Sequence, residues 1–526
     1  MTKQLQYAIN KIPVLLTQFG LKQTWLNLLF THLKQQEKFH YITESKEFNH
    51  CEILKTNLLE NLEITEIGTL YEYSLASLNY RNKKQNGQYF TPKDVSKLLA
   101  NYSKRFNIGK WYDPCCGIGN LSWFLIDIQE NKEDFLKNNL ILSDKDKLAL
   151  FIARVLLTIS FQNKETNLFN EIEQNFIEFD FLSVSQNGLF DSLHQIPKHD
   201  YVIVNPPYFN CSEDARFETS KCTDLYAYFL ENIIKTSKGF ISITPQSFTN
   251  AEKFTSLRSL LLKMFENLTI YCFDNVPDSI FKGVKFGSTN TNHSNSVRAA
   301  IIVAGSNFAG RKITSLMRWR TVERKEMFAN LDKFLSEVTL TNKYFPKVSS
   351  FFADFYKSLN LNKTLGNIVS NKETKYALYI PSSPRYYISA LKKPVKRSSM
   401  KTLYFNNEND YNKAYLLLNS SLTYWWWRVK DGGMTLSEET LNTIPLVDFD
   451  IQNNLIQKLE ISENTHKVYK LNAGIEQENV KHPLDLIDNV NTVLYRANYL
   501  TMCHKNSDLE FYENVFGMQT ISMFDK

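Results

Sequence analysis

Four consecutive residues carry the groups of an amine-binding site: Asn205, Pro206, Pro207 and Tyr208. They follow residues 201–204, an apolar stretch that predicts a buried strand. The prolines restrict the backbone and lack N–H donors, so the Pro206 carbonyl is held in one direction beside the side-chain oxygen of Asn205. Two such acceptors suit an NH₂ group, and the Tyr208 ring offers a flat face for a planar base. An ordinary turn after a buried strand would have the same composition.

Glycines are scarce, 17 in 526 residues, so the two in the stretch DPCCGIGNL (residues 113–121) are informative. The stretch lies between an expected strand at 110–113 and a helix expected from about Asn120, where a tight turn lets the backbone approach a nucleotide-like ligand. It is not the dinucleotide-binding pattern GxGxxG, because the third glycine is missing. Gly117 and Gly119 therefore predict a loop that binds such a ligand through its backbone.

Two further strands are expected to end at acidic residues. Asp144 follows the second strand, and a carboxylate there can accept both hydroxyl protons of a ribose. Asp180 follows the third strand, where it can accept from an exocyclic amine, and the adjacent Phe181 can pack on a purine. The order of these groups along the chain points to an adenosyl ligand.

The elements that must position these groups alternate between strands and helices. Apolar stretches predict strands over residues 110–113, 139–143, 176–179, 201–204, 240–244, 269–273 and 298–304. Periodicity predicts helices over residues 91–102, from about 120, 147–159, 225–235 and 253–265. In the first helix, Thr91 is expected as N-cap and Pro92 as the first helical residue. Such alternation is typical of a doubly wound α/β sheet, which binds ligands at the carboxyl ends of its strands.

Composition divides the chain into three regions. Residues 1–80 are expected to be helical, residues 81–307 hold the alternating pattern after a polar connector, and residues 308–526 form a separate aromatic and basic domain with helices at its end. Residues 311–430 contain 22 Lys and Arg against 8 Asp and Glu, although the whole chain has a net charge of only +6. Such a segment is typical of a surface for nucleic acid, or of a lysine-rich solvated surface.

Composition also excludes several classes of protein. With 43% hydrophobic and 22% charged residues the chain has ordinary globular usage, and it lacks an apolar stretch long enough to cross a bilayer or a readable secretory signal. Its seven cysteines form no CxxC pair, so we expect neither a disulfide framework nor a bound metal. A reducing cytoplasm is the expected environment, without membrane contact.

Several ordered motifs together resemble the N6-adenine DNA methyltransferases. They are GQYFTP (87–92), DPCCGIGNL with Asp144 and Asp180, NPPY (205–208), DLYAYF (224–229) and ITPQSF (243–248). Their order, with the basic region last, is similar to the γ class found in type II modification enzymes and in type I modification subunits of restriction–modification systems. The likeness covers residues 87–305 and, more loosely, the C-terminal region. It implies a Rossmann-like class I methyltransferase domain, flanked by an N-terminal helical region and a C-terminal target-recognition domain.

The resemblance implies S-adenosylmethionine as cofactor and methyl donor. Thr91, Asp113 and the loop around Gly117 would border its methionine part, Asp144 its ribose and Asp180 its adenine. The full set of implied cofactor-binding residues is Thr91, Asp113, Cys115, Gly117, Gly119, Asp144, Asp180, Phe181 and Asn205.

The resemblance also places the target adenine, flipped out of double-stranded DNA, at the residues 205–208. Hydrogen bonds from its N6 to the Asn205 oxygen and the Pro206 carbonyl would favour a pyramidal nitrogen aimed at the methyl group, with direct transfer and no covalent intermediate. Tyr208 would stack on one face of the base and Phe281 on the other, with Phe286 as the competing candidate. The Pro-Cys pair at Cys115 lies inside the glycine loop, so we do not expect it to act as a nucleophile.

The basic region supplies the expected DNA contacts. Its candidates, which combine with nearby aromatic rings, are Lys392, Lys393, Lys396, Arg397 and Lys401. The run YWWWR at 424–428 has two interpretations, core packing on a helix and DNA contact. A separately encoded restriction endonuclease is implied by the resemblance as a partner.

Three other interpretations remain open from the sequence. A modification subunit would need a separate specificity chain, which the long region after residue 307 argues against. Protein and RNA methyltransferases also carry NPPY, but resemble only the catalytic half of this chain. A catalytically silent DNA- or cofactor-binding protein would not need an intact NPPY motif with both aspartates.

Overall fold

The computed structural model describes residues 2–78, 91–163, 166–184, 193–275, 278–281, 285–286, 289–290, 297–359, 363–384, 387–431, 435–472 and 474–495. The chain forms two compact units. Unit 1 consists of Met1–Asn275, Ser279–Lys312 and Leu340–Lys343, and unit 2 of Val276–Asp278, Ile313–Thr339 and Tyr344–Lys526. The predicted boundaries at residues 80 and 307 stay predictions.

Unit 1 holds the alternating elements. Its helices are α1 (Lys3–Lys34), α2 (Ile64–Leu78), α4 (Lys93–Tyr102), α5 (Asn120–Asp127), α6 (Lys132–Asp134), α7 (Lys147–Phe161), α8 (Leu168–Glu171), α9 (Leu225–Thr236) and α10 (Thr255–Met264). Its strands are β1 (Trp111–Asp113), β2 (Leu140–Asp144), β3 (Phe176–Glu178), β4 (Tyr201–Val204), β5 (Gly239–Pro245), β6 (Leu268–Phe273), β7 (Lys285–Phe286), β8 (Thr289–Asn290), β9 (Ala299–Ala304) and β10 (Arg311–Met317), inside which the division between the units falls.

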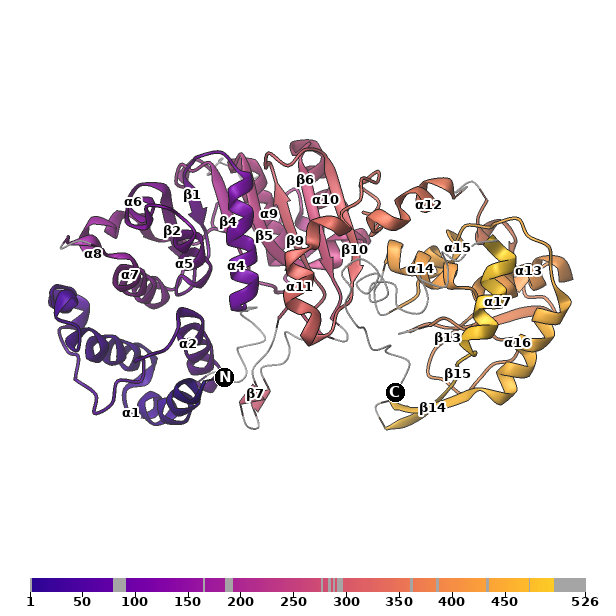
Figure 1. Ribbon diagram of the computed structural model, residues 1–526, viewed down its shortest axis with the longest axis horizontal. Coiled ribbons are helices and arrows are strands. Elements are labelled where there is room, and N and C mark those ends of the chain that lie inside the picture. Colours follow the sequence, from indigo (N-terminus) through magenta and orange to yellow (C-terminus); the bar gives the residue numbers. More distant parts are fainter. Residues whose placement is uncertain are drawn as a thin grey trace. The chain divides into compact units, whose positions relative to one another are not determined.

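Eight of these strands form one sheet in the order β10-β6-β9-β5-β4-β1-β2-β3 (Figure 1). Strands β3, β2, β1, β4 and β5 run parallel, whereas β9 is antiparallel to both of its neighbours, β5 and β6. The chain builds outward from β1 through β2 to β3, then returns to β4 on the other side of β1. The strand order therefore reverses between β1 and β4, which is where such sheets bind ligands. The doubly wound α/β fold is confirmed.

The first helix of the sheet region begins later than predicted. Lys93 is the first residue of α4 and Pro92 is its N-cap, with no side-chain capping bond. The expectation that Thr91 caps this helix is therefore wrong, because its hydroxyl is used elsewhere: it accepts a hydrogen bond from Asn205.

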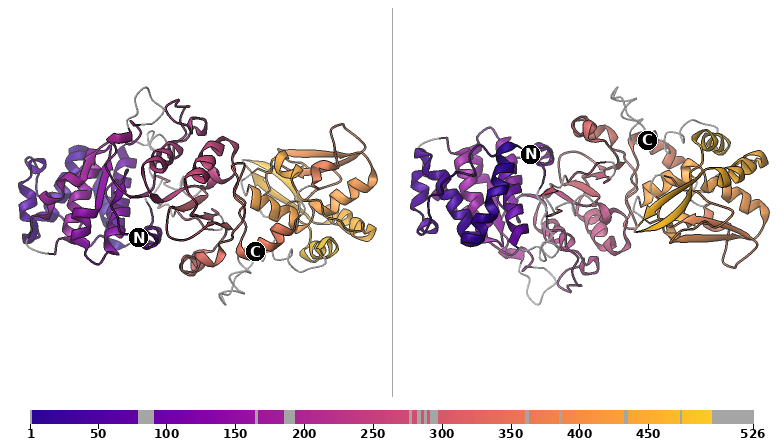
Figure 2. Two further views of the ribbon diagram at one scale, coloured as in Figure 1. Left: turned by 90° about the horizontal axis from the view of Figure 1, so that it is seen from above. Right: turned by 90° about the horizontal axis from the view of Figure 1, so that it is seen from below.

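The N-terminal helices share a hydrophobic core with the sheet region. The cluster joins buried side chains of α1 and α2 to those of α5 and α7, and these helices lie side by side in all the views (Figures 1 and 2). Within α1 the helical backbone is broken at Gly20, which has φ 73° and so takes the left-handed conformation that glycine tolerates. The N-terminal region therefore packs as part of unit 1.

Unit 2 is built from short helices and small antiparallel sheets. Its helices are α11 (Arg324–Ala329), α12 (Ala353–Ser358), α13 (Glu408–Leu418), α14 (Ser421–Lys430), α15 (Glu438–Asn442), α16 (Asn453–Thr465) and α17 (Leu484–Tyr495). Its strands are β11 (Val369–Ser370), β12 (Tyr376–Pro381), β13 (Met400–Phe405), β14 (Lys467–Asn472) and β15 (Ile475–Val480).

The aromatic run lies on α14, where Trp425, Trp426 and Trp427 are each at most 5% exposed, so these rings are core residues. None of the described helices is long and apolar enough to span a bilayer.

Candidate active site

A cleft with about 1200 Å³ of empty space, part of it open solvent, lies where the strand order reverses. It is lined from the loops after β1, β2, β3 and β4, so one cleft collects motifs that are far apart in the sequence. The predicted residues that line it are Thr91, Asp113, Cys115, Gly117, Asp144, Asp180, Phe181, Asn205, Pro206 and Pro207. Gly119, Tyr208 and Phe281 are not among the lining residues.

The glycine loop needs its glycines for two different reasons. Gly117 has φ 54° and would carry a Cβ into open space, so it serves backbone conformation. Gly119 has φ 82°, is the N-cap of α5, and would bring a Cβ to 3.3 Å from the Ala153 Cβ on α7. The loop is tied to β2, since the Gly117 N–H donates to Asp144 Oδ2 at 2.8 Å.

Two buried carboxyl groups face this loop. Burial raises the pKa of Asp113 to about 7, against the opposing effect of a hydrogen bond from the Ser122 hydroxyl. Burial also raises the pKa of Asp144, although the backbone N–H groups of Asp146 and Gly117 donate to its oxygens. The charge of Asp144 raises the pKa of Asp113 further, so a cationic ligand beside these groups would stabilise their ionised forms.

A side-chain network connects Thr91 with two of the motifs. The Asn205 amide donates to Thr91 Oγ1 at 3.1 Å, and the Asn120 amide donates to the Thr91 carbonyl at 2.9 Å. Asn120 lines the cleft, and its buried side-chain oxygen has no hydrogen-bond partner among the described residues. The sequence reasoning missed Asn120, although it directly follows Gly119 in the glycine-rich motif.

Tyr208 uses its hydroxyl as well as its ring. The hydroxyl lies 2.5 Å from Asn205 Oδ1 and 2.8 Å from the carbonyl oxygen of Ile243 on β5. The ring makes a T-shaped contact with Phe281, with centroids 6.0 Å apart. A base sandwiched between two rings needs roughly 3.5 Å on each side. A base therefore fits between Tyr208 and Phe281 only once these rings have separated.

The second stacking residue stays a prediction. Phe281 is 2% exposed, and its ring contacts that of Tyr208 directly. The competing Phe286 belongs to the short strand β7, and its side chain lies outside the described part of the structure.

The predicted adenine-binding residues lie just after β3. Asp180 is exposed, and its side chain accepts from the Leu182 N–H at 3.0 Å. Phe181 is 1% exposed and packs against Phe229 and Tyr112, with centroid distances of 5.2 and 6.0 Å. Both line the cleft, but the buried Phe181 is largely a core residue.

Cys115 is a poor nucleophile in this position. Burial raises the pKa of its thiol well above the usual value, and the charge of Asp113 raises it further. The thiol donates to the Asn205 carbonyl at 3.4 Å. A protonated thiol does not attack a base, so Cys115 serves packing of the loop against the NPPY segment.

The predicted DNA-binding cations in unit 2 differ in availability. Lys392 pairs with Glu460 at 2.5 Å, and Arg397 donates to Asn479. Lys393 and Lys396 are exposed, and Lys401 is half-buried on β13. Only part of the predicted patch therefore presents exposed lysines.

Residues from the N-terminal helices also line the cleft. Tyr71 and Leu75 on α2 belong to its wall, and neither residue is part of a motif that the sequence analysis could recognise. In the described residues, no group of His, Cys, Asp and Glu is arranged to hold a metal ion.

Solved structures similar to this chain include methyltransferases and restriction–modification proteins at low identity. The DrdV–DNA complex is 14% identical, with a TM-score of 0.44, over 73% of this chain and 44% of that chain. A putative class I S-adenosylmethionine-dependent methyltransferase from Listeria monocytogenes is 16% identical, with a TM-score of 0.34, over 58% and 87%. A modification subunit of a putative type I restriction enzyme from Vibrio vulnificus YJ016 is 13% identical, with a TM-score of 0.34, over 52% and 60%.

A comparison with curated proteins finds no match for the chain. The family model described as N-6 DNA Methylase, in contrast, matches residues 63–286. This match includes the glycine loop, both buried carboxyl groups and the NPPY segment, and it confirms the resemblance seen in the motifs. The part of the chain that resembles the N-6 DNA Methylase family is therefore the part that forms the cleft on the doubly wound sheet.

Proposed function

We propose that the protein transfers a methyl group from S-adenosylmethionine to N6 of an adenine in double-stranded DNA. The observation that carries this proposal is the position of Asn205 beside the cleft. Its side chain bonds Thr91, which the motif resemblance assigns to the cofactor, and it is part of the NPPY segment assigned to the base.

The residues that line the cleft fit the cofactor. Asp144 and Asp180 supply acceptors for ribose hydroxyls and an adenine amine, and the loop glycine Gly117 leaves its Cβ position open. Asp113 and the unpartnered oxygen of Asn120 are acceptors suited to a cationic amino group. When bound, S-adenosylmethionine supplies an electrophilic methyl group on a sulfonium.

The NPPY segment would hold the target amine. An amide oxygen can accept two hydrogen bonds, so the Asn205 oxygen and the Pro206 carbonyl are both acceptors suited to an amine. Hydrogen bonds from N6 to these two oxygens would direct the nitrogen lone pair at the methyl group. Flipping the base costs a few kcal/mol, and stacking on Tyr208, at about 1–3 kcal/mol, offsets part of this.

We further propose that unit 2 recognises the DNA target and that the activity protects host DNA in a restriction–modification system. The exposed Lys393 and Lys396 support the first part by offering cations to phosphates. The second part rests on the motif resemblance, which also implies a separately encoded nuclease.

The test is transfer of labelled methyl from S-adenosylmethionine by the purified chain to unmethylated genomic DNA, transfer RNA, ribosomal RNA and a release factor. We expect label in the DNA alone. Label in RNA or release factor would overturn the proposed substrate. Label in DNA only after a specificity chain is added would show that target recognition lies outside this chain.

A further inference from the structure

We propose that helix α2 is part of the cofactor site, with Tyr71 and Leu75 forming one wall of the cleft and the Tyr71 hydroxyl positioning the loop that carries Asp144. This inference rests on the proposed use of S-adenosylmethionine. It assigns a role in cofactor binding to the N-terminal helices, which no sequence motif marks as functional.

The contact that carries the proposal joins α2 to the loop after β2. The Tyr71 hydroxyl donates to Asp146 Oδ2 at 2.9 Å, across 75 residues of chain. The Asp146 backbone N–H in turn donates to Asp144 Oδ1 at 2.9 Å. Tyr71 is thus two hydrogen-bonded steps from the carboxylate expected to bind the ribose.

Asp146 is also fixed from its other side. Its Oδ1 accepts from the N–H groups of Leu148 and Ala149 and so caps α7. Both carboxylate oxygens of Asp146 are therefore engaged, one by α2 and one by the first turn of α7. Burial and the charge of Asp146 raise the pKa of Tyr71, so its hydroxyl keeps the proton that it donates.

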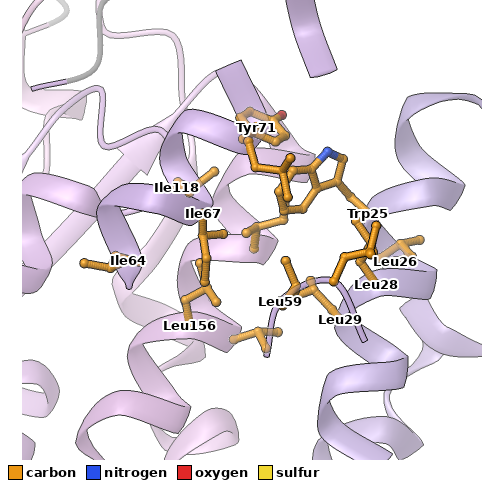
Figure 3. Packing of buried hydrophobic residues seen from close by; sticks show 14 of the residues in the cluster. Trp25, Leu26, Leu28, Leu29, Leu59, Ile64, Ile67, Tyr71, Ile118 and Leu156 are labelled. Carbon is orange, nitrogen blue, oxygen red and sulfur yellow. The ribbon is translucent and has the colours of Figure 1, made fainter. Parts of the chain in front are cut away.

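Tyr71 is held in place by α1. Its ring makes a T-shaped contact with Trp25 at 5.1 Å, and Trp25 donates to Ser74 on α2 at 3.2 Å. Figure 3 shows these rings in the cluster that also contains Ile118. Because Ile118 lies between the two glycines of the loop after β1, the same N-terminal core supports both cofactor loops.

The test measures binding of S-adenosylhomocysteine to the full chain by titration calorimetry. Tyr71→Phe removes only the hydroxyl and keeps the ring against Trp25. We expect its Kd to rise about tenfold, since the lost bond is to a charged group. Tyr7→Phe is the matched control, because Tyr7 on α1 is 41% exposed, and it should bind as the wild type does.

The variants should also separate cofactor from DNA. In Tyr71→Phe the KM for S-adenosylmethionine should rise while the affinity for duplex DNA stays unchanged, which general destabilisation would not produce. Wild-type binding of S-adenosylhomocysteine by Tyr71→Phe would overturn the inference. Absence of binding by the wild-type protein would overturn the proposed function itself.

A second variant tests the route through Asp146. Asp146→Asn keeps the capping oxygen of α7 but removes the charge that accepts from Tyr71. If Tyr71 acts through Asp146, the double variant Tyr71→Phe/Asp146→Asn should lose little more affinity than either single variant. Losses that add would contradict positioning through Asp146.

Discussion

At the scale of single residues, the site is a chain of polar contacts in which Asn205 is held from two sides. Thr91 accepts from its amide and the Tyr208 hydroxyl lies at its oxygen. The types of these residues were predictable from the NPPY motif, because acceptors and a ring have evident uses. The bond from the Tyr208 hydroxyl to the Ile243 carbonyl could not be predicted, because Ile243 lies on a strand 35 residues later in the chain.

Substitutions at Tyr208 separate its ring from its hydroxyl. Tyr208→Phe keeps a stacking face but frees the Asn205 oxygen from an orienting bond, so kcat should fall about tenfold. Tyr208→Ala also removes the ring, so its kcat should fall further. Asn205→Ala should lower kcat about 100-fold or more. Single-turnover methyl transfer measures the rate of each of the three variants. A wild-type rate for Tyr208→Phe would show that the hydroxyl does not contribute to catalysis.

Asp113 should make stability depend on pH. Its folded pKa of about 7 lies above the ordinary value of 3.8, so the folded protein retains a proton that the unfolded chain releases. The stability that comes from the protonated Asp113 carboxyl is complete below about pH 4. It declines as the pH rises to about 7.

Urea unfolding of the ligand-free protein at pH 5 and pH 8 measures this effect. Between these values the wild type should lose about 2 kcal/mol relative to Asp113→Asn, whose amide does not ionise. Equal pH dependence of the two proteins would mean that Asp113 is already ionised at pH 5.

At the scale of elements, the strands that carry the site were predicted nearly to the residue, because continuous apolar runs mark buried parallel strands. The strand over 201–204 matches β4 in full, and Asp144 ends β2 as expected. The predicted start of α4 was wrong, because the Thr91 hydroxyl accepts from Asn205 and the helix begins one residue later, at Lys93. The contact between α2 and the loop after β2 could not be predicted from the sequence, because only tertiary packing brings Tyr71 to Asp146.

The glycine loop gives a prediction at this scale. Gly119→Ala combines a positive φ with a Cβ contact at 3.3 Å to Ala153, so it should both destabilise the protein and weaken S-adenosylhomocysteine binding. Gly474→Ala is the control: its φ of 80° is similar, and no atom lies within 4 Å of the added Cβ. Thermal unfolding and calorimetry should show that Gly119→Ala loses both stability and cofactor affinity. Gly474→Ala should lose stability alone. If both variants bind S-adenosylhomocysteine equally well, the close approach of α5 and α7 is not needed for cofactor binding.

At the scale of the whole molecule, the charge is unevenly distributed between catalytic and basic regions. The sequence shows this imbalance as a composition, but it could not tell which cations are already paired. Lys392 is paired with Glu460, whereas Lys393 and Lys396 are exposed. This difference makes the expected DNA contact testable lysine by lysine.

Replacing Lys393 and Lys396 by Ala should weaken DNA binding and lower the slope of log Kd against log salt by about 2, one unit for each lost phosphate contact. Lys458→Ala, at an exposed lysine on α16, serves as control and should leave the slope unchanged. Fluorescence anisotropy across a salt series measures both. An unchanged slope in the double variant would remove these lysines from the DNA contact.

The central claim is that two oxygens of the NPPY segment hold an adenine amine for direct methylation. The most direct measurement is mass spectrometry of nucleosides from duplex DNA treated with the purified chain and methyl-labelled S-adenosylmethionine. We expect all transferred label in N6-methyladenine, and no label in DNA treated with Asn205→Ala. Label in a methylated cytosine, or equal N6-methyladenine from Asn205→Ala, would contradict the account.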